Sequence, residues 1–484
     1  MELAVDRVEL IARVGEGHLQ DVADALEPDR AVAAVVAHAC APPAGRGMRA
    51  WERRRGRPPI ISLTDGSVNY GKMITSAGAG EAPAPSRGRW PVLAGLAWMS
   101  AATGFVAASL APVVPALMRD LALSPTTAGV ALGAWQAALG LSSVAVGALI
   151  SRWGAARVVA VGAALTALSS LSRAAAVDGV TLVLAVALGG VAWSMVISGA
   201  ASLLTTAFEG RARRLGAGIT FGGLSAGFAL MLAVGPHLAG LPGGWRTALA
   251  AGAVPMLAGL PAWLLLSREL RARPPAAARI RQVLGQSLDL LRRPSILAVL
   301  AATLSGISAG HALASWLPTV LGRQGLSASL AGLVAAGYMA IGILSSISVT
   351  VVARPHHRRW WITGGLAAVA ASLLLLAVGS APLVAAGIVA AGVAIGFLPS
   401  LLVLAMLESP PARSLGGAAG GLYYSMSGFA GLTGPVVIGV FADWTGGFTA
   451  GLVAMAALVA AGAAVAAGAL PMPPSAAASA SEAA

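Results

Sequence analysis

A histidine in the middle of a long apolar stretch is the side chain best placed for proton chemistry. His311 lies in the segment S-G-I-S-A-G-H-A-L-A-S, in which Ser305, Ser308, Ala312 and Ser315 recur at helical spacing and make one small polar face. Histidine changes charge near neutral pH, so it can take up and release a proton there. We expect His311 to couple a proton or to contact a ligand beside these serines. The alternative is a neutral histidine that is hydrogen-bonded to a neighbouring helix.

Aromatic residues stand at matching places in two similar segments. Trp135 and Tyr338 are 203 positions apart, and each comes 11 residues after a serine, Ser124 or Ser327, that is suited to cap a helix. At ~1.5 Å per residue, both rings would lie ~16 Å into their helices. Gln136 adjoins the tryptophan, and the three side chains suit the wall of a binding cavity. Packing between helices is the alternative.

Two tyrosines and two glycine-proline pairs complete the set of residues that could shape a ligand site. Tyr423 and Tyr424 place hydroxyl groups in an apolar run, with helix packing as the alternative. Glycine permits helices to approach closely and proline removes a backbone donor. We therefore expect a bend or a flexible contact at Gly235-Pro236 and at Gly434-Pro435.

Common signatures of ATP use and of metal catalysis are missing. The chain has no G-x-x-x-x-G-K-[ST] phosphate loop and no H-E-x-x-H zinc motif, and no pair of acids occurs within an apolar run. Cys40 is the single cysteine, which excludes cysteine-based metal sites and disulfides within the chain. We expect no enzymatic activity, no metal, no cofactor and no direct use of ATP.

Composition places most of the chain in lipid. The 484 residues are 57% hydrophobic and 11% charged, whereas roughly a quarter of a soluble domain is charged. The net charge of +13 comes from arginines that alternate with apolar runs, and Lys72 is the only lysine. This alternation is typical of charges that flank membrane spans. We therefore expect a lipid bilayer, and no nucleic acid, beside the basic residues.

About twelve apolar runs are near the ~20 residues with which a helix crosses a bilayer. Helices are expected because they satisfy their own backbone groups in lipid. The runs lie near residues 91–114, 126–150, 157–174, 180–206, 215–239, 246–266, 295–317, 328–351, 361–379, 382–406, 415–440 and 447–470. Loops on one side hold roughly 16 arginines, against about four on the other, namely Arg119, Arg173, Arg246 and Arg323. This imbalance predicts a cell (inner) membrane protein with both termini in the cytoplasm.

The chain repeats itself. The segment P-A-L-M-R-D-L-A-L-S-P-T-T-A-G at Pro115 returns as P-T-V-L-G-R-Q-G-L-S-A-S-L-A-G at Pro318. The pattern G-P-x-x-x-G-x-x-x-x-W likewise occurs at Gly235 and at Gly434. Each motif falls at the same topological place in both copies. We therefore predict an all-α membrane protein whose twelve or so helices form two pseudo-symmetric six-helix bundles.

The predicted organisation has five parts. A cytoplasmic N-terminal tail covers residues 1–89, followed by the N-terminal bundle at 90–266, a basic cytoplasmic loop at 267–294, the C-terminal bundle at 295–470 and a disordered tail at 471–484. We expect the first tail to be disordered, or to be partly an artefact of the start site, with translation beginning at Met73. A small regulatory domain in residues 1–72 is the alternative.

This plan resembles the major facilitator superfamily. The stretch G-A-L-I-S-R-W-G-A-A-R-V-V is similar to the family's loop G-x-L-x-D-R-x-G-R-[RK] between the second and third spans. Gly147, Arg152 and Gly154 match this motif, Ser151 replaces the family's acid, and Arg157 stands one position late. In the family, the acid joins charge contacts that stabilise one conformation. The resemblance therefore implies the fold and leaves this gating contact open.

The resemblance implies a secondary active transporter that moves a small solute by alternating access, as a monomer. The substrate would bind between the bundles near the middle of the membrane. The stretch S-W-L-P-T-V-L at 315–321 is similar to the cyanate-transporter-like branch. Uptake of a small anion such as cyanate and efflux of a drug or metabolite both stay open. The alternative is a membrane sensor or scaffold of the same shape that does not transport.

Overall fold

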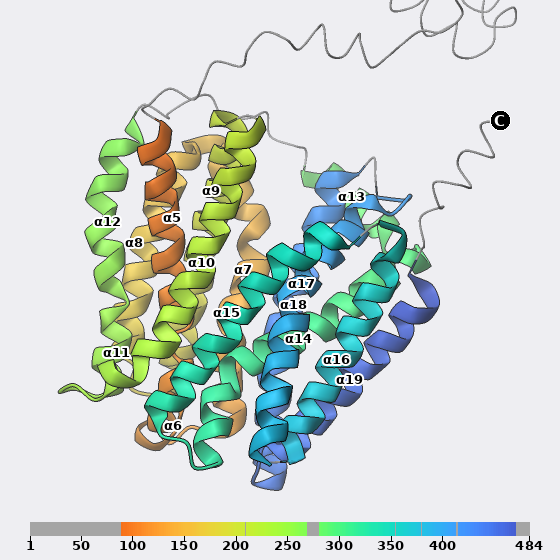
Figure 1. Cartoon of the computed structure of the whole chain (residues 1–484). Coiled ribbons are helices and arrows are strands. Elements are labelled where there is room, and N and C mark those ends of the chain that lie inside the picture. Colours follow the sequence, from red (N-terminus) through yellow and green to blue (C-terminus); the bar gives the residue numbers. More distant parts are fainter. Residues whose placement is uncertain are drawn as a thin grey trace, which may run out of the picture. The chain divides into compact units, whose positions relative to one another are not determined.

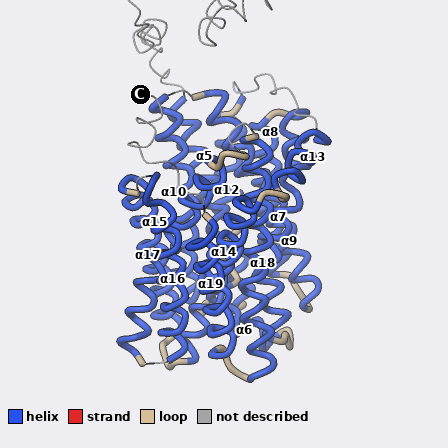
Figure 2. Tube along the Cα trace, turned by 90° about the vertical axis from the view of Figure 1, so that its right-hand side faces the viewer, coloured by secondary structure: helices blue, strands red, loops and turns tan. Residues whose placement is uncertain are grey.

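The computed structural model describes residues 89–208, 210–268, 280–353, 355–378, 380–412 and 415–470. Within these ranges, all regular secondary structure is helical (Figure 1, Figure 2). The predicted tails before Arg89 and after Leu470 lie outside the described residues, and so does part of the central loop, 269–279.

The first half of the described chain folds into helices that follow the predicted spans. They are α5 (Arg89–Ala107), η1 (Ala111–Val113), α6 (Val114–Asp120), α7 (Pro125–Trp153), α8 (Ala155–Ala174), α9 (Gly179–Ala207), α10 (Gly210–Ala239), α11 (Trp245–Ala251) and α12 (Ala253–Leu266). The first predicted span is interrupted after Ala107. Pro112 and Pro115 lie in the first turns of η1 and α6, where the missing N–H of proline removes no helical hydrogen bond.

The second half repeats this order after one additional helix. Its helices are α13 (Ile280–Leu290), α14 (Pro294–Arg323), α15 (Ala328–Val352), η3 (Pro355–His357), α16 (Arg358–Val378), α17 (Ala381–Glu408), α18 (Gly416–Thr445) and α19 (Thr449–Ala469). Helix α13 occupies part of the segment that the sequence analysis assigned to a loop. The other helices agree with the predicted spans.

The number of spans agrees with the prediction. Among the described residues, eleven helical segments are long and apolar enough to cross a membrane. Helix α7 supplies a twelfth if its two parts, Pro125–Ser143 and Ala145–Trp153, which meet at 58°, count as one span. Large apolar side chains such as Leu141 and Leu333 remain exposed on the helices, as expected for faces in contact with lipid.

The predicted helix caps are confirmed. The Ser124 hydroxyl accepts a hydrogen bond from the backbone N of Thr127 at 3.1 Å, and that of Ser327 accepts one from Leu330 N at 3.3 Å. Between α7 and α8, Gly154 has a φ of +83°, a region that glycine enters without a steric penalty.

Two helix pairs join the halves, and they are related by the repeat. Helix α7 packs on α18, and α10 packs on α15. In each pair, the second span of one half meets the fifth span of the other. This reciprocal pairing is what two pseudo-symmetric bundles would produce.

Candidate functional site

A cluster of four side chains lies where the halves meet. We call Trp135 and Gln136 of α7, Trp193 of α9 and His311 of α14 the junction cluster. The Trp135 and Trp193 rings are stacked, with centroids 4.2 Å apart and 7° between their planes. The His311 ring also contacts Trp135, with ring centroids 5.5 Å apart and 49° between the ring planes. Three predicted site residues are therefore brought together, and Trp193 joins them.

A hydrogen bond between the halves runs through this cluster. The side-chain nitrogen Nε2 of Gln136 is bonded to Nε2 of His311. An amide nitrogen only donates, so in this orientation the histidine nitrogen accepts. The other ring nitrogen, Nδ1, then carries the proton and donates it to the carbonyl oxygen of Ile307 at 3.0 Å. The arrangement fits a neutral imidazole.

Glycines allow the helices to approach the cluster. A Cβ atom at Gly190 of α9 would clash with the Trp135 carbonyl, and one at Gly431 of α18 would lie 2.5 Å from Cγ of Gln136. These two glycines set the spacing of α7 to α9 and α18. Trp193 Nε1 is buried without a hydrogen-bond partner among the described residues. Trp193 was not among the predicted site residues, although it lies about one helical turn after the Gly189-Gly190 pair of the fourth span.

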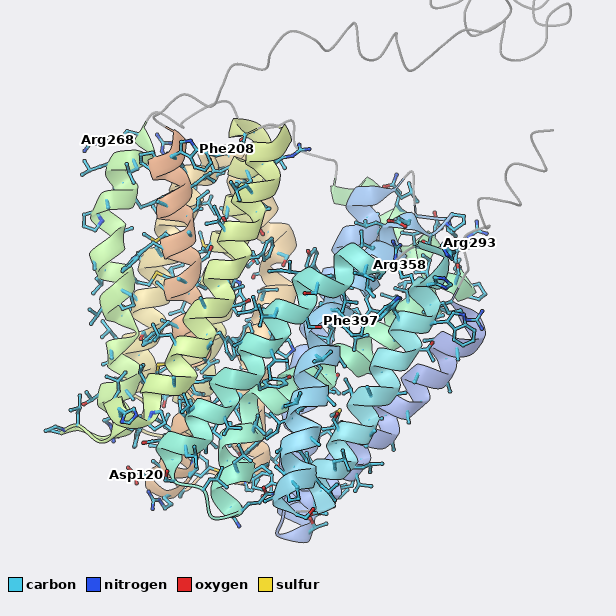
Figure 3. The ribbon with its side chains drawn as sticks, viewed as in Figure 1. Asp120, Phe208, Arg268, Arg293, Arg358 and Phe397 are labelled. Atoms are coloured by element: carbon cyan, nitrogen blue, oxygen red, sulfur yellow. The ribbon has the colours of Figure 1, made fainter. Side chains whose placement is uncertain are left out.

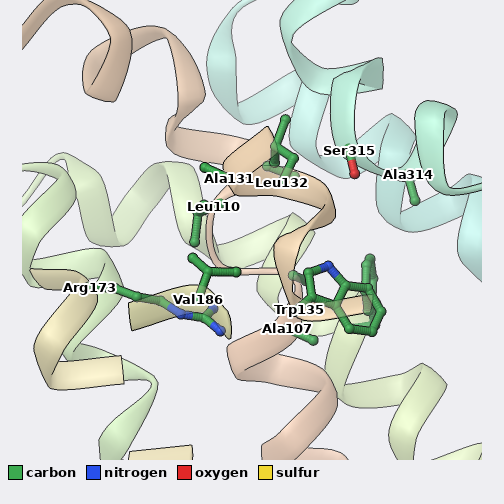
Figure 4. A pocket seen from close by; sticks show the side chains of 12 residues that line it. Ala107, Leu110, Ala131, Leu132, Trp135, Arg173, Val186, Ala314 and Ser315 are labelled. Atoms are coloured by element: carbon green, nitrogen blue, oxygen red, sulfur yellow. The ribbon is translucent and has the colours of Figure 1, made fainter. Parts of the chain in front are cut away.

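A cavity lies beside the cluster (Figure 4). In this conformation it has room for at most about one water molecule. Trp135 and Arg173 contribute to its wall from the first half, and Ala314 and Ser315 of α14 contribute from the second. The cavity is therefore lined by residues of both halves.

Arg173 occupies a different environment from the one predicted. The charge pattern placed it in a loop, but it lies in the last turn of α8 and is only 1% exposed. Its side chain points along the cavity toward Val186 (Figure 4), and its guanidinium donates a hydrogen bond to the Val106 carbonyl.

The predicted tyrosines are placed apart from the junction cluster. Tyr338 is buried in α15 beside α17, and its hydroxyl has no partner among the described residues. No ring contact among those residues joins it to Trp135. Tyr423 donates from its hydroxyl to the Pro399 carbonyl at 2.9 Å and packs edge-on against Tyr424, which is half exposed.

The serines of α14 face the interior of the second half. Ser305 Oγ donates to the Ala301 carbonyl at 3.0 Å and lies against Gly462 of α19. The Ser308 carbonyl lies against Gly434 of α18. Both serines therefore take part in close helix packing around His311.

The glycine-proline pairs lie at close helix contacts. The Pro435 carbonyl accepts a hydrogen bond from Trp316 Nε1 at 3.0 Å and faces Gly129 of α7. The Pro236 ring lies beside Gly332 of α15, and Gly235 packs on Pro112. A helix with an internal proline lacks one backbone hydrogen bond, which permits a bend at these contacts.

One end of the α7–α18 pair is tightly closed, and we call it the clasped end. Asp443 Oδ2 accepts hydrogen bonds from the backbone N of Thr126, at 2.8 Å, and from the Thr126 hydroxyl. Gly439 lies so near the Pro125 carbonyl that a Cβ atom would clash. Close contact continues as far as Gly140 and Gly428.

We call the other end of the same pair the open end, because its glycines touch no neighbouring helix. Added Cβ atoms at Gly147 of α7 and at Gly420 and Gly421 of α18 would meet no atom within 4 Å. The predicted loop motif lies at this end, where Ser151 Oγ donates to the Gly147 carbonyl at 3.1 Å and Arg152 and Arg157 are exposed.

Known proteins share this fold. A family model described as Major Facilitator Superfamily matches residues 96–420. A bacterial homolog of the human lysosomal transporter Spinster, inward-facing and occupied, superimposes with a TM-score of 0.66 at 16% identity, over 78% of this chain and 96% of that one. Its unoccupied form gives 0.65 at 16%, over 79% and 97%, and a nucleoside transporter, NupG, gives 0.63 at 15%, over 78% and 98%. At such identities the likeness concerns the fold. No curated protein matches the sequence significantly.

Proposed function

Because the chain belongs to the Major Facilitator Superfamily, we propose that it moves a small solute across a membrane by alternating access, without ATP. Family membership makes it a multi-pass membrane protein and a secondary transporter, and not an enzyme. Both halves of the site come from one chain, so we propose that a monomer is sufficient for transport.

The observation that supports this proposal is the partly buried Gln136–His311 hydrogen bond. It connects the halves next to Trp135, which lines the cavity. Rocking of one half against the other changes the distance between these two side chains. A solute in the cavity would therefore lie next to a hydrogen bond that has to break and form again when the halves move.

His311 gives this contact a dependence on protons. The neutral ring accepts from the Gln136 amide nitrogen, as described above. A protonated ring has two donors, so the amide must turn its oxygen toward His311 to keep the bond. Proton binding thus exchanges one inter-half hydrogen bond for another. We propose that this exchange couples a proton to transport.

The charges at the two ends of the helices support a proposed orientation in the membrane. Arg268 and Arg293 lie at one end of the helices and Asp120 at the other (Figure 3). Arginine-rich ends remain in the cytoplasm. We propose that the clasped end faces outward and the open end faces the cytoplasm of a bacterial-type cell. Efflux of a metabolite or drug and uptake of a small anion both fit this arrangement.

Counterflow in proteoliposomes tests the proposal. The probes are one neutral solute, uridine, one inorganic anion, cyanate, one aromatic carboxylate, benzoate, and one lipophilic cation, tetraphenylphosphonium. We expect saturable counterflow of at least one probe, and faster net flux when a pH gradient is imposed. His311→Ala should retain counterflow and lose the response to the gradient. His356→Ala, which changes an exposed histidine, is the matched control.

Two results would contradict the proposal. A folded protein that gives no saturable counterflow with any probe would support the sensor or scaffold alternative. A His311→Ala variant that keeps full gradient-driven flux would remove the histidine from the coupling mechanism and leave transport itself intact.

A further inference from the structure

Arg173 is a buried cation that has no anionic partner among the described residues. Its Nη1 donates to the Val106 carbonyl at 2.8 Å and to Ser109 Oγ at 3.3 Å. Its Nε is buried without any hydrogen bond, and Nη2 has no acceptor among the described residues. The two ion pairs among those residues belong to other arginines, Arg292 and Arg358.

The surroundings make room for this guanidinium. A Cβ atom at Gly189 of α9 would clash with Nη2 and would lie 2.6 Å from Ser169 Oγ. The glycine therefore lets the side chain pass along α9 to the cavity, where it lies near Val186 (Figure 4). Trp135 also lines this cavity.

An unpaired arginine at this depth is energetically costly. Arginine remains protonated in proteins, so it cannot avoid the penalty by losing its charge. Removing a charge from water costs several kcal/mol, and an opposite charge with good hydrogen-bond geometry offsets that cost. The two unused groups, Nε and Nη2, form one edge of the guanidinium. A carboxylate binds such an edge with two parallel hydrogen bonds.

We propose that, when the two halves separate and enlarge this cavity, Arg173 binds the anionic group of the transported solute, and that the solute is a small organic monoanion whose apolar part lies against Trp135. Because Arg173 carries a single positive charge, we expect the solute to carry a single negative charge. The apolar wall formed by Leu110, Leu132 and Val186 favours a carboxylate with a hydrocarbon or aromatic body over an inorganic anion. This inference rests on the proposed transport function and specifies its substrate class.

A second role for Arg173 must be separated from binding. The Val106 carbonyl belongs to the last turn of α5, so Arg173 also caps the C-terminal end of that helix. A purely structural arginine would stabilise the fold equally for charged and neutral solutes. Comparison of a carboxylate with its own amide therefore distinguishes the two roles.

The test uses the full chain and three pairs of probes: benzoate and benzamide, lactate and lactamide, and indole-3-acetate and indole-3-acetamide. We expect wild-type protein to bind or exchange at least one acid in preference to its amide, measured by ligand-dependent thermal stability and by counterflow. Arg173→Gln should reduce that preference roughly 10- to 100-fold. Arg173→Lys, which keeps the charge without the fork, should give an intermediate value. Arg323→Gln, a change at an exposed arginine, should have no effect.

The outcomes are distinct. Wild-type protein that prefers none of the acids over its amide would overturn this inference, even if the glutamine variant fails to fold. An acid preference that survives in a folded Arg173→Gln protein would also overturn it. Counterflow of uridine without any acid preference would leave the transport proposal standing and remove the anion site. Absence of counterflow with all probes would refute the transport proposal itself.

Discussion

Asp443 caps a helix that belongs to the other half of the molecule. Thr126 is the second residue of α7, and its backbone N–H has no partner within that helix. Asp443 Oδ2 accepts this N–H at 2.8 Å and also the Thr126 hydroxyl. The carboxylate also lies at the positive end of the α7 dipole. We predict that Asp443→Asn weakens the clasped end.

The size of the effect follows from these contacts. A hydrogen bond to a charged group contributes about 1.5–3 kcal/mol and a neutral one about 0.5–1.5 kcal/mol, so the substitution removes about 1 kcal/mol. Asp443 is exposed, so solvent screening limits the helix-dipole contribution to ~0.3 kcal/mol. The sum of about 1.3 kcal/mol changes the ratio of clasped to opened molecules about ninefold.

Distance measurements between spin labels would detect this change. Cysteines are introduced at Arg119 and Trp444, which are exposed on opposite halves near the clasped end, after replacement of Cys40 by serine. We expect one short distance in the parent protein and a second, longer population in Asp443→Asn.

A matched carboxylate provides the control. Asp120 accepts a hydrogen bond from Trp245 Nε1 at 2.8 Å near the same end of the helices, but within the first half. Asp120→Asn should therefore leave the distance distribution unchanged. The reasoning is wrong if Asp443→Asn shows no longer population, or if Asp120→Asn produces an equal one.

Three further predictions concern packing and helix ends. Gly190→Ala should destabilise the protein by about 1–3 kcal/mol in thermal unfolding because the new methyl group meets the Trp135 carbonyl; Gly147→Ala, in open space, should be neutral or slightly stabilising. Trp193→Ala should destabilise the fold by about 3–5 kcal/mol, whereas Trp193→Phe should retain most of the stability, and a transport defect in the phenylalanine variant would indicate that Nε1 contacts the solute. Backbone and side-chain hydrogen bonds from Thr181 lower the pKa of the Asp178 carboxyl group. The ionised carboxylate therefore stabilises the fold above its unfolded pKa of ~3.9, and this contribution is lost as the pH falls through the lower pKa of the folded state. Unfolding curves of Asp178→Asn should therefore depend less on pH in this range than those of the parent protein.

Hydropathy and capping chemistry were sufficient to predict most of the fold. Long apolar runs become helices because lipid leaves the backbone no other partner, and Ser124 and Ser327 begin two of them as predicted. The short helix α13 was missed because an amphipathic segment of 11 residues is too short to cross a membrane and carries no hydropathy signal.

The site was predictable only in part. The equal spacing of Trp135 and Tyr338 predicted that both rings line a cavity. Trp135 lines the described cavity and Tyr338 does not, because a repeat in sequence does not require both copies to face the same space. Arg173 was counted among the arginines of the outer loops because it lies at the end of an apolar run. Its burial depends on a contact with Val106, 67 residues away, where α5 ends. Such a contact has no signature in local sequence.

The two joints between the halves differ in chemistry. The α7–α18 joint combines glycine packing with a carboxylate that water can reach, whereas the described contacts of Gly332 in the α10–α15 joint are to the Pro236 ring and the Leu232 carbonyl. Hydration therefore weakens the first joint more readily than the second. We therefore expect the outer end of the molecule to open first between α7 and α18, on the Asp443 side, while α10 and α15 stay in contact.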